Sequence, residues 1–173
     1  LRARIERELT LLEYPKRSWL TPRRTPDGEP ILDVAIVGAG QGGMAAAFGL
    51  MRERVDNLLL LDRNPLDHAG PLLSFARMHT LRTPKHVSGP DLGVPSLTPR
   101  AYYEATHPEG SWDALGLIPR QTWAAYLSFY RRVLGLPVQP DTQVGALRWE
   151  PALRAFALPC THAGEKQLRY ARR

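Results

Sequence analysis

The chain has 173 residues, of which 43% are hydrophobic and 23% charged, with a formal net charge of +6 at pH 7. These values are typical of one globular domain, or one domain with an appendage, and no apolar run is long enough to span a membrane. The single cysteine, Cys160, excludes an internal disulfide, and the sequence contains no cluster of metal ligands. The arginines are scattered and no nucleic-acid-binding motif accompanies them, so we expect no nucleic-acid partner. Because the sequence shows neither a signal-peptide pattern nor a membrane span, we expect a cytoplasmic protein.

Two segments precede the main domain. Residues 1–14 predict an amphipathic helix, because their apolar side chains recur at helical spacing. These apolar residues are Leu1, Ile5, Leu9 and Leu12. Residues 15–32 are rich in proline and include the turn pair Asp27-Gly28, which indicates an extended arm. Residues 33–173 are predicted to form a partial dinucleotide-binding domain.

A glycine motif lies between two predicted elements of this domain. The apolar run Val34–Val37 indicates a buried parallel strand, and the alanine-rich run Met44–Met51 indicates a helix. Between them, Gly38 suits a tight turn, Gly40 lets a pyrophosphate approach the backbone, and Gly43 allows close packing of helix and strand. The order strand, glycines, helix therefore predicts a dinucleotide site at the start of the helix.

The next predicted strand, Leu58–Leu61, ends in Asp62. An acidic residue about 20 residues beyond the glycines is typical of a group that binds ribose hydroxyls. Arg63 follows directly and keeps a ribose phosphate open as an alternative. The competing interpretation is an ordinary strand–helix–strand unit in which Asp62 only ends a strand.

The rest of the chain divides into an irregular part and a regular part. Proline and glycine recur in residues 63–119, but this segment also carries many apolar and aromatic side chains. We therefore expect a packed irregular insertion with a short helix near residues 100–106. Residues 121–134 predict a helix with a buried aromatic stripe, ended by Gly135. Residues 142–172 predict a β-meander of three short strands. These strands are expected at residues 142–149, 154–158 and 167–172.

Several segments together carry a family resemblance: Asp33–Gly43, Leu60–Arg63, Gly70–Lys85, Gly89–Gly93 and Ile118–Arg120. On these residues the chain resembles the N-terminal, FAD-binding portion of bacterial FAD/NAD(P)-binding oxidoreductases related to flavin-containing monooxygenases. The resemblance implies an α/β fold: a Rossmann-like FAD-binding domain with a parallel sheet, helices and a three-stranded meander.

The resemblance also implies cofactor contacts for individual residues. The residues facing the FAD pyrophosphate would be Gly38, Gly40, Gln41, Gly42 and Gly43. Asp62 would bind the adenosine ribose, Arg63 would border the adenine, and Val144 would touch the adenine through its backbone. The residues nearer the flavin ring would be Met78, Thr80 and Arg82. Two positions depart from the family: Leu72 stands where an aromatic residue is common, and Asp62 stands where many relatives have Glu.

In the family, the meander is followed by a strand that returns to the central sheet, and a second glycine motif binds the NADPH that reduces FAD. Neither feature occurs in this sequence, so we expect an apparently truncated domain. Its expected role is the FAD-binding part of an NAD(P)H-dependent, flavin monooxygenase-like oxidoreductase that acts on a small-molecule substrate. By itself this part would not be catalytically complete, and no catalytic residue is assigned.

Two alternatives remain open. One is an NAD(P)-binding domain of a Rossmann dehydrogenase. The other is a non-enzymatic remnant, or a docking subunit of a split flavoprotein, that pairs with a second chain or with itself through an open sheet edge.

Overall fold

The computed structural model describes residues 1–15, 17–68, 70–87 and 89–173. Lys16 of the predicted arm and two residues of the predicted insertion, Ala69 and Ser88, lie outside the described residues. The chain forms two compact units, each built from two separate stretches. The helical unit comprises Leu1–Tyr14 and Pro71–Gly135, and the sheet unit comprises Pro15–Gly70 and Leu136–Arg173.

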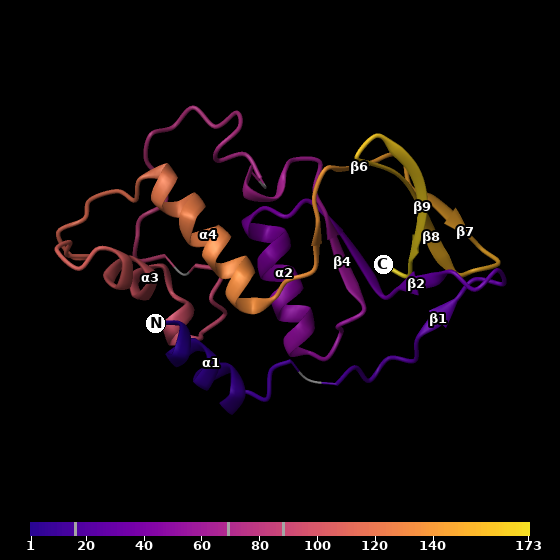
Figure 1. Cartoon of the computed structure of the whole chain (residues 1–173), viewed down its shortest axis with the longest axis horizontal. Coiled ribbons are helices and arrows are strands. Elements are labelled where there is room, and N and C mark those ends of the chain that lie inside the picture. Colours follow the sequence, from indigo (N-terminus) through magenta and orange to yellow (C-terminus); the bar gives the residue numbers. More distant parts are fainter. Residues whose placement is uncertain (16, 69, 88) are drawn as a thin grey trace. The chain divides into compact units, whose positions relative to one another are not determined.

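The sheet unit contains the predicted strand–helix–strand unit. Strands β3 (Val34–Val37) and β4 (Leu58–Leu61) are parallel and joined by helix α2 (Gln41–Arg52), which lies beside β4 in Figure 1. β4 is almost wholly buried, as its unbroken apolar run predicts. A third parallel strand, β5 (Val138–Gln139), pairs with β4 and was not expected from the sequence. It has only two residues and lies between prolines, so it carries no periodic signal.

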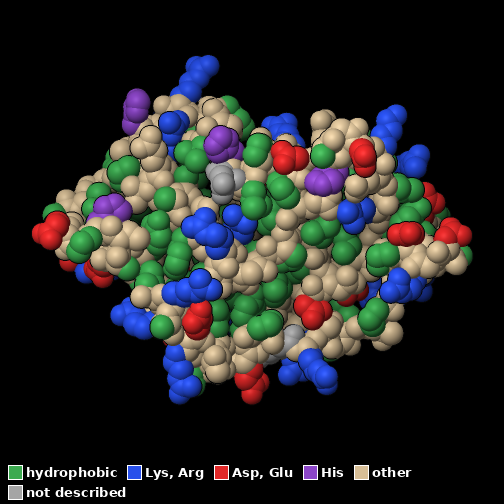
Figure 2. Space-filling model, in the orientation of Figure 1, with side chains coloured by type: hydrophobic (Ala, Val, Ile, Leu, Met, Phe, Trp, Pro, Cys, Tyr) green, Lys and Arg blue, Asp and Glu red, His purple; other side chains and the backbone are tan. Residues whose placement is uncertain are grey.

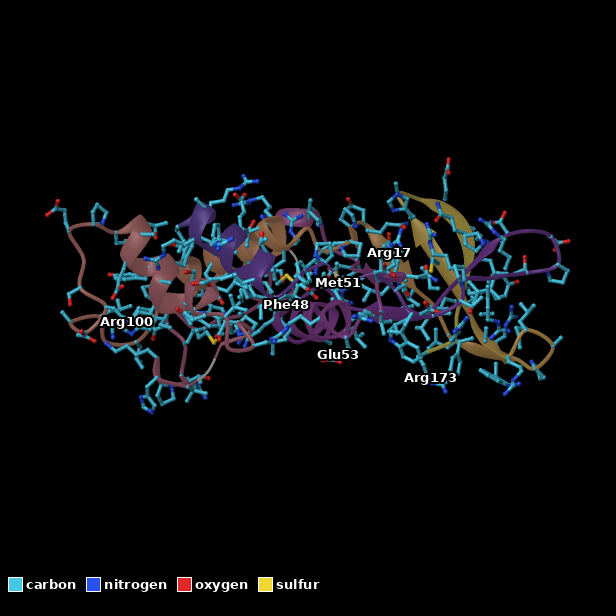
Figure 3. All side chains as sticks on the ribbon, turned by 90° about the horizontal axis from the view of Figure 1, so that it is seen from below. Arg17, Phe48, Met51, Glu53, Arg100 and Arg173 are labelled. Atoms are coloured by element: carbon cyan, nitrogen blue, oxygen red, sulfur yellow. The ribbon has the colours of Figure 1, made fainter. Side chains whose placement is uncertain are left out.

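Helix α2 buries one side and is held at its end by the proline-rich arm. Met44, Ala47 and Phe48 are buried at helical spacing. Figure 3 labels Phe48 and Met51 in this helix and Glu53 just beyond it. The indole nitrogen of Trp19, in the arm, donates a hydrogen bond to the Glu53 carbonyl at 3.1 Å. The arm is therefore attached to the sheet unit at the C-terminal end of α2.

The second sheet of this unit is the predicted meander, extended by the arm. It contains β6 (Thr142–Val144), β7 (Arg148–Glu150), β8 (Ala155–His162) and β9 (Glu165–Ala171). β8 and β9 form a hairpin whose two turn residues, Ala163 and Gly164, both have positive φ, as a type I′ hairpin turn requires. Two arm strands, β1 (Arg23–Arg24) and β2 (Pro30–Leu32), join the sheet, with β2 parallel to β9.

One predicted strand of the meander is divided in the structure. Residues 142–149 were expected as a single strand, but β6 and β7 are separate and both pair with β8. Val144 is opposite Cys160 and Arg148 is opposite Ala157, so the β6–β7 side has one residue more than β8. An extra residue disrupts the ladder locally, and this accounts for the break.

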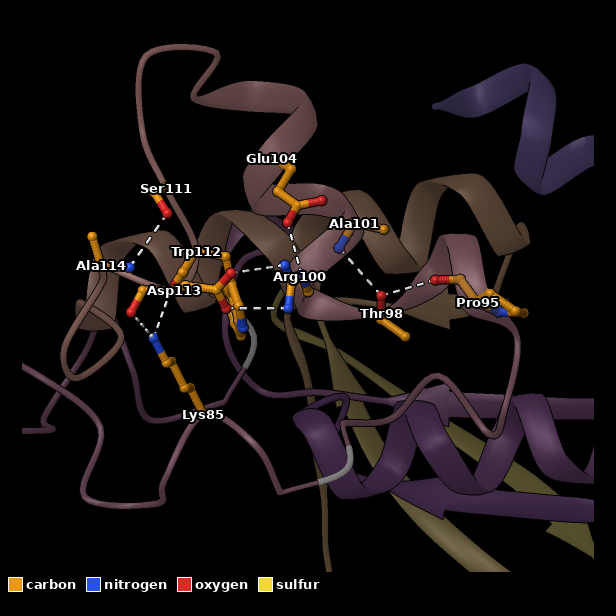
Figure 4. Close-up of polar contacts among 10 residues, drawn as sticks. All are labelled: Lys85, Pro95, Thr98, Arg100, Ala101, Glu104, Ser111, Trp112, Asp113 and Ala114. Carbon is orange, nitrogen blue, oxygen red and sulfur yellow. Dashed lines mark hydrogen bonds and ion pairs between the residues drawn. The ribbon is translucent and has the colours of Figure 1, made fainter.

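In the helical unit, helix α1 (Arg2–Leu11) ends three residues before the predicted segment does and packs on the 3₁₀ helix η2 (Pro95–Leu97). Ile5 and Leu9 of α1 are buried. The predicted short helix is α3 (Pro99–Thr106). In Figure 4 the Thr98 side chain accepts a hydrogen bond from the Ala101 amide at 3.2 Å, an N-cap that starts α3.

Helix α4 (Arg120–Leu134) ends at Gly135, whose left-handed φ of 62° makes it the expected C-terminal glycine. Its predicted stripe is buried: Trp123, Tyr126, Leu127, Tyr130 and Leu134. The Tyr126 and Tyr130 hydroxyls donate to the carbonyls of Leu97 (2.8 Å) and Pro90 (2.6 Å). The stripe is therefore part of the core, and burial raises the pKa of Tyr126 so that its hydroxyl remains a donor.

The irregular insertion has its own polar attachments. In Figure 4 the Lys85 ammonium donates to the carbonyls of Trp112 (2.5 Å) and Asp113 (3.0 Å), and it also donates to that of Leu115. Arg100 bridges Glu104 and Asp113 at the surface.

No helix among the described residues is long and apolar enough to cross a membrane. On the face shown in Figure 2, basic and acidic side chains are interspersed.

Candidate dinucleotide-binding site

The glycine motif forms a tight loop between β3 and α2. Gly38 has a φ of 103°, a conformation open mainly to glycine, and its amide donates to the Leu61 carbonyl at 2.8 Å. A Cβ on Gly43 would lie 2.0 Å from the Gly38 carbonyl oxygen, which no side chain could tolerate. Gly38 therefore makes the turn, and Gly43 brings the helix against the loop, in the positions that the sequence predicts.

The other glycines add no side chain at the start of α2. Gly40 is the N-cap, and as a glycine it supplies no capping hydrogen bond of its own. A Cβ on Gly42 would have no heavy atom within 4 Å, and one on Gly40 would meet only the Gly70 Cα, at 3.7 Å. Gln41 begins the first turn, where backbone N–H groups have no carbonyl partner within the helix. This end of α2 is therefore suited to an anionic group.

Gly70 also lies beside the glycine loop, a position that the sequence does not predict. It has a φ of 77°, and a Cβ added to it would lie 3.2 Å from the Gly40 Cα. A side chain here would crowd the backbone of the glycine motif. Its position next to Gly40 is a contact between residues 30 apart, for which the sequence carries no local signal.

Asp62 follows β4 directly and lies against the glycine loop. Its carboxylate accepts a hydrogen bond from the Ala39 amide at 2.7 Å and another from the Asn64 amide at 2.9 Å. Its backbone is fixed too: its amide donates to the Gln139 carbonyl at 3.1 Å, and its carbonyl accepts from Thr142 at 2.8 Å. The side chain is only 4% exposed. The structure thus joins Asp62 to the glycine loop through its carboxylate.

The remaining predicted site residues divide between the two units. Arg63 is exposed beside Asp62, and Val144 of β6 packs on the cluster that includes Leu61. Met78 and Arg82 belong to the helical unit, where they flank the bridge between Thr80 and Pro119. Within the sheet unit the structure therefore brings together the glycine motif, Asp62, Arg63 and Val144.

The arrangement has the chemistry of a binding site. No group of three or more potential metal ligands occurs among the described residues. The loop offers backbone N–H groups and space, and Asp62 offers carboxylate oxygens that accept hydrogen bonds. These features fit the pyrophosphate and ribose of a dinucleotide.

No family model matches the chain. The chain is 50% identical over 147 residues to the FAD-dependent urate hydroxylase of Xanthomonas campestris pv. campestris. The match covers 85% of this chain and 30% of that protein, so the chain spans less than a third of the length of this curated relative.

Solved flavoproteins have the same fold. The ornithine hydroxylase of Pseudomonas aeruginosa matches with a TM-score of 0.65 and 17% identity, over 82% of this chain and 37% of that one. The Kutzneria sp. 744 ornithine N-hydroxylase matches with a TM-score of 0.63 and 17% identity, over 83% and 36%. A flavin monooxygenase from Stenotrophomonas maltophilia matches with a TM-score of 0.59 and 21% identity, over 82% and 36%.

At these identities, the solved structures show the Rossmann-type fold of FAD-binding flavoproteins, which confirms the expected fold class. The curated relative adds a close sequence relationship. Over most of its length the chain is therefore similar in sequence to one part of an FAD-dependent hydroxylase, and it has the fold of the corresponding part of FAD-binding flavoproteins.

Proposed function

We propose that the chain is the FAD-binding part of an NAD(P)H-dependent, flavin monooxygenase-like oxidoreductase. The observation that carries the proposal is the glycine loop at the start of α2, whose N-cap is Gly40, with the Asp62 carboxylate bonded to the same loop. The close relative, which is FAD-dependent, supports FAD as the ligand.

Each element of the site has a proposed contact with the ADP half of FAD. The pyrophosphate would lie against the first turn of α2, where Gly40 and Gly42 leave room for it. Asp62 would accept a hydrogen bond from a ribose hydroxyl through the lone pairs that its two amide donors leave open. Arg63 would border the adenine, and Val144 would contact it through its backbone.

The family resemblance extends the proposal to the flavin half. Met78 and Arg82 would lie nearer the flavin ring. When bound, FAD would supply the redox chemistry, whereas the residues of this chain would bind and orient it. A protein of the relative's full length would add the NAD(P)H site and the substrate pocket, and it would hydroxylate a small molecule.

Two architectural features favour FAD over NAD as the primary ligand. The antiparallel meander β6–β9 follows the parallel strands directly, and the helical unit interrupts the chain between β4 and β5. A plain NAD-binding domain would instead continue with further strand–helix repeats.

The test measures equilibrium binding of FAD, NAD⁺ and NADP⁺ to the purified 173-residue chain. Quenching of flavin fluorescence monitors FAD, and calorimetry monitors all three ligands. We expect saturable one-to-one binding of FAD, with NAD⁺ and NADP⁺ at least about tenfold weaker, equivalent to roughly 1.4 kcal/mol. Tighter binding of NAD⁺ than of FAD would favour a dehydrogenase domain. A folded chain that binds none of the three would overturn the proposal.

A further inference from the structure

The Asp62 carboxylate has two backbone amide donors, one for each oxygen. Oδ2 accepts from the Ala39 amide at 2.7 Å, across 23 residues of sequence, and Oδ1 accepts from the Asn64 amide at 2.9 Å. Ala39 is completely buried and Asp62 is 4% exposed, so water replaces neither bond easily. Bonds from N–H groups to a carboxylate are stronger than bonds between neutral groups.

The peptide that Asp62 holds is the central one of the glycine loop. Ala39 lies between Gly38, which has a left-handed φ of 103°, and Gly40, the N-cap of α2. Glycines have a wide choice of backbone conformations, so a loop built from them needs an outside contact to keep one shape. The Asp62–Ala39 bond is such a contact, because it ties the loop to the end of β4.

We infer that Asp62 is a positioning residue for the glycine loop, which it holds in its phosphate-binding shape whether or not a nucleotide is bound. This role is additional to the ribose contact proposed above, and its effect on ligand affinity rests on the proposed function. The position therefore requires two acceptor oxygens as well as polarity. An asparagine has one acceptor oxygen and one NH₂ group, so one of the two amides would face another donor.

The substitution Asp62→Asn separates the two roles. An asparagine amide can still exchange a hydrogen bond with a ribose hydroxyl, but it cannot accept from both Ala39 and Asn64. The matched control is Asp141→Asn, which removes the same charge from an exposed position of the sheet unit. Asp141 has a φ of 48°, a conformation that asparagine tolerates.

The first experiment titrates wild type, Asp62→Asn and Asp141→Asn with ADP and with 2′,3′-dideoxy-ADP. Changes in NMR chemical shifts during each titration give the affinity. Both probes carry the adenine and the pyrophosphate, and only ADP carries the ribose hydroxyls. We expect Asp62→Asn to lower the affinity for both probes by a similar factor of about ten, because a buried backbone amide loses its acceptor. A loss of affinity for ADP without a loss for dideoxy-ADP would overturn the inference, because the effect would then depend on the ribose hydroxyls.

The second experiment needs neither ligand nor variant. Hydrogen exchange of the Ala39 amide in the ligand-free wild-type chain should be slowed as strongly as that of the β4 amides. Exchange at the rate of an unstructured peptide would overturn the inference, even if Asp62→Asn fails to fold. If ADP and FAD do not bind wild type while the Ala39 amide is protected, the proposed function fails and the positioning role stands.

Discussion

Gly43 and Gly42 are adjacent in the first turn of α2, but their surroundings differ. A Cβ on Gly43 would lie 2.0 Å from the Gly38 oxygen and 3.3 Å from the Ile36 side chain, whereas one on Gly42 would meet nothing within 4 Å. We expect Gly43→Ala to lower the free energy of unfolding by roughly 3 kcal/mol or more, because backbone must move to admit the methyl group. Urea denaturation followed by circular dichroism measures this change.

Gly42→Ala is the matched control for that prediction. Alanine favours a helix over glycine, and the site is open, so the variant should be as stable as wild type or more stable by about 0.5–1 kcal/mol. Equal stability of the two variants would contradict the packing described for Gly43.

Cys160 is buried at 4% exposure in the core of the meander, and its thiol donates to the Leu158 carbonyl at 3.2 Å. Burial raises the pKa of this thiol above its ordinary value, although Arg169 opposes the shift. We expect iodoacetamide to modify the native chain at neutral pH on the order of 100-fold more slowly than the chain in urea, since reaction requires opening of the sheet. Mass spectrometry measures both rates, and similar rates would show that Cys160 is accessible.

At the residue scale, the sequence predicts what a fixed spacing can encode. The turn at Gly38, the close packing at Gly43 and the position of Asp62 all follow from the order of strand, glycines, helix and acid. The bond from Ala39 to Asp62 and the contact of Gly70 with Gly40 do not follow, because each depends on how distant residues meet.

Helix α1 is the element whose attachment rests most clearly on one side chain. The Glu8 carboxylate accepts from the Ser96 amide at 3.0 Å and from its hydroxyl at 2.7 Å. We expect Glu8→Ala to destabilise the chain by about 1–3 kcal/mol, because the buried amide and hydroxyl of Ser96 would lose their acceptor. Chemical denaturation monitored by tryptophan fluorescence provides the measurement.

Glu6→Ala is the control on the same helix. Glu6 forms an exposed ion pair with Arg2 at 2.9 Å, a kind of pair that contributes little, so this variant should stay within about 0.5 kcal/mol of wild type. If Glu8→Ala proves as mild as Glu6→Ala, Glu8 does not anchor α1.

The elements that the sequence predicts are those with a periodic pattern or an unbroken apolar run. The stripe from Trp123 to Leu134 indicates α4, and the apolar run before Asp62 indicates β4. β5 was missed because two residues between prolines show no period, and the break between β6 and β7 arises from pairing with β8. Both depend on the partner strand more than on local sequence.

At the scale of the whole chain, the compact units do not follow chain order. The sequence predicts segments 1–14, 15–32 and 33–173 in chain order, and in the structure the helical unit combines Leu1–Tyr14 with Pro71–Gly135. Burial of Ile5 and the contacts of Glu8 with Ser96 account for this grouping within the helical unit. Such long-range packing has no signature in either segment alone.

The central claim, that the glycine loop binds the pyrophosphate of FAD, is tested most directly at Gly40. Its φ of −72° and ψ of −176° are open to alanine, and the nearest atom to an added Cβ is 3.7 Å away. Gly40→Ala should therefore fold like wild type, yet place a methyl group where the pyrophosphate approaches the backbone. Gly116→Ala, at an open position of the helical unit, is the matched control.

The measurement is the Kd for FAD of wild type, Gly40→Ala and Gly116→Ala, with the thermal midpoint of each chain recorded alongside. The account predicts unchanged thermal midpoints for all three chains, unchanged FAD affinity for Gly116→Ala, and affinity weakened at least about tenfold, or roughly 1.4 kcal/mol, for Gly40→Ala. A Gly40→Ala chain that is folded and binds FAD as tightly as wild type would contradict it.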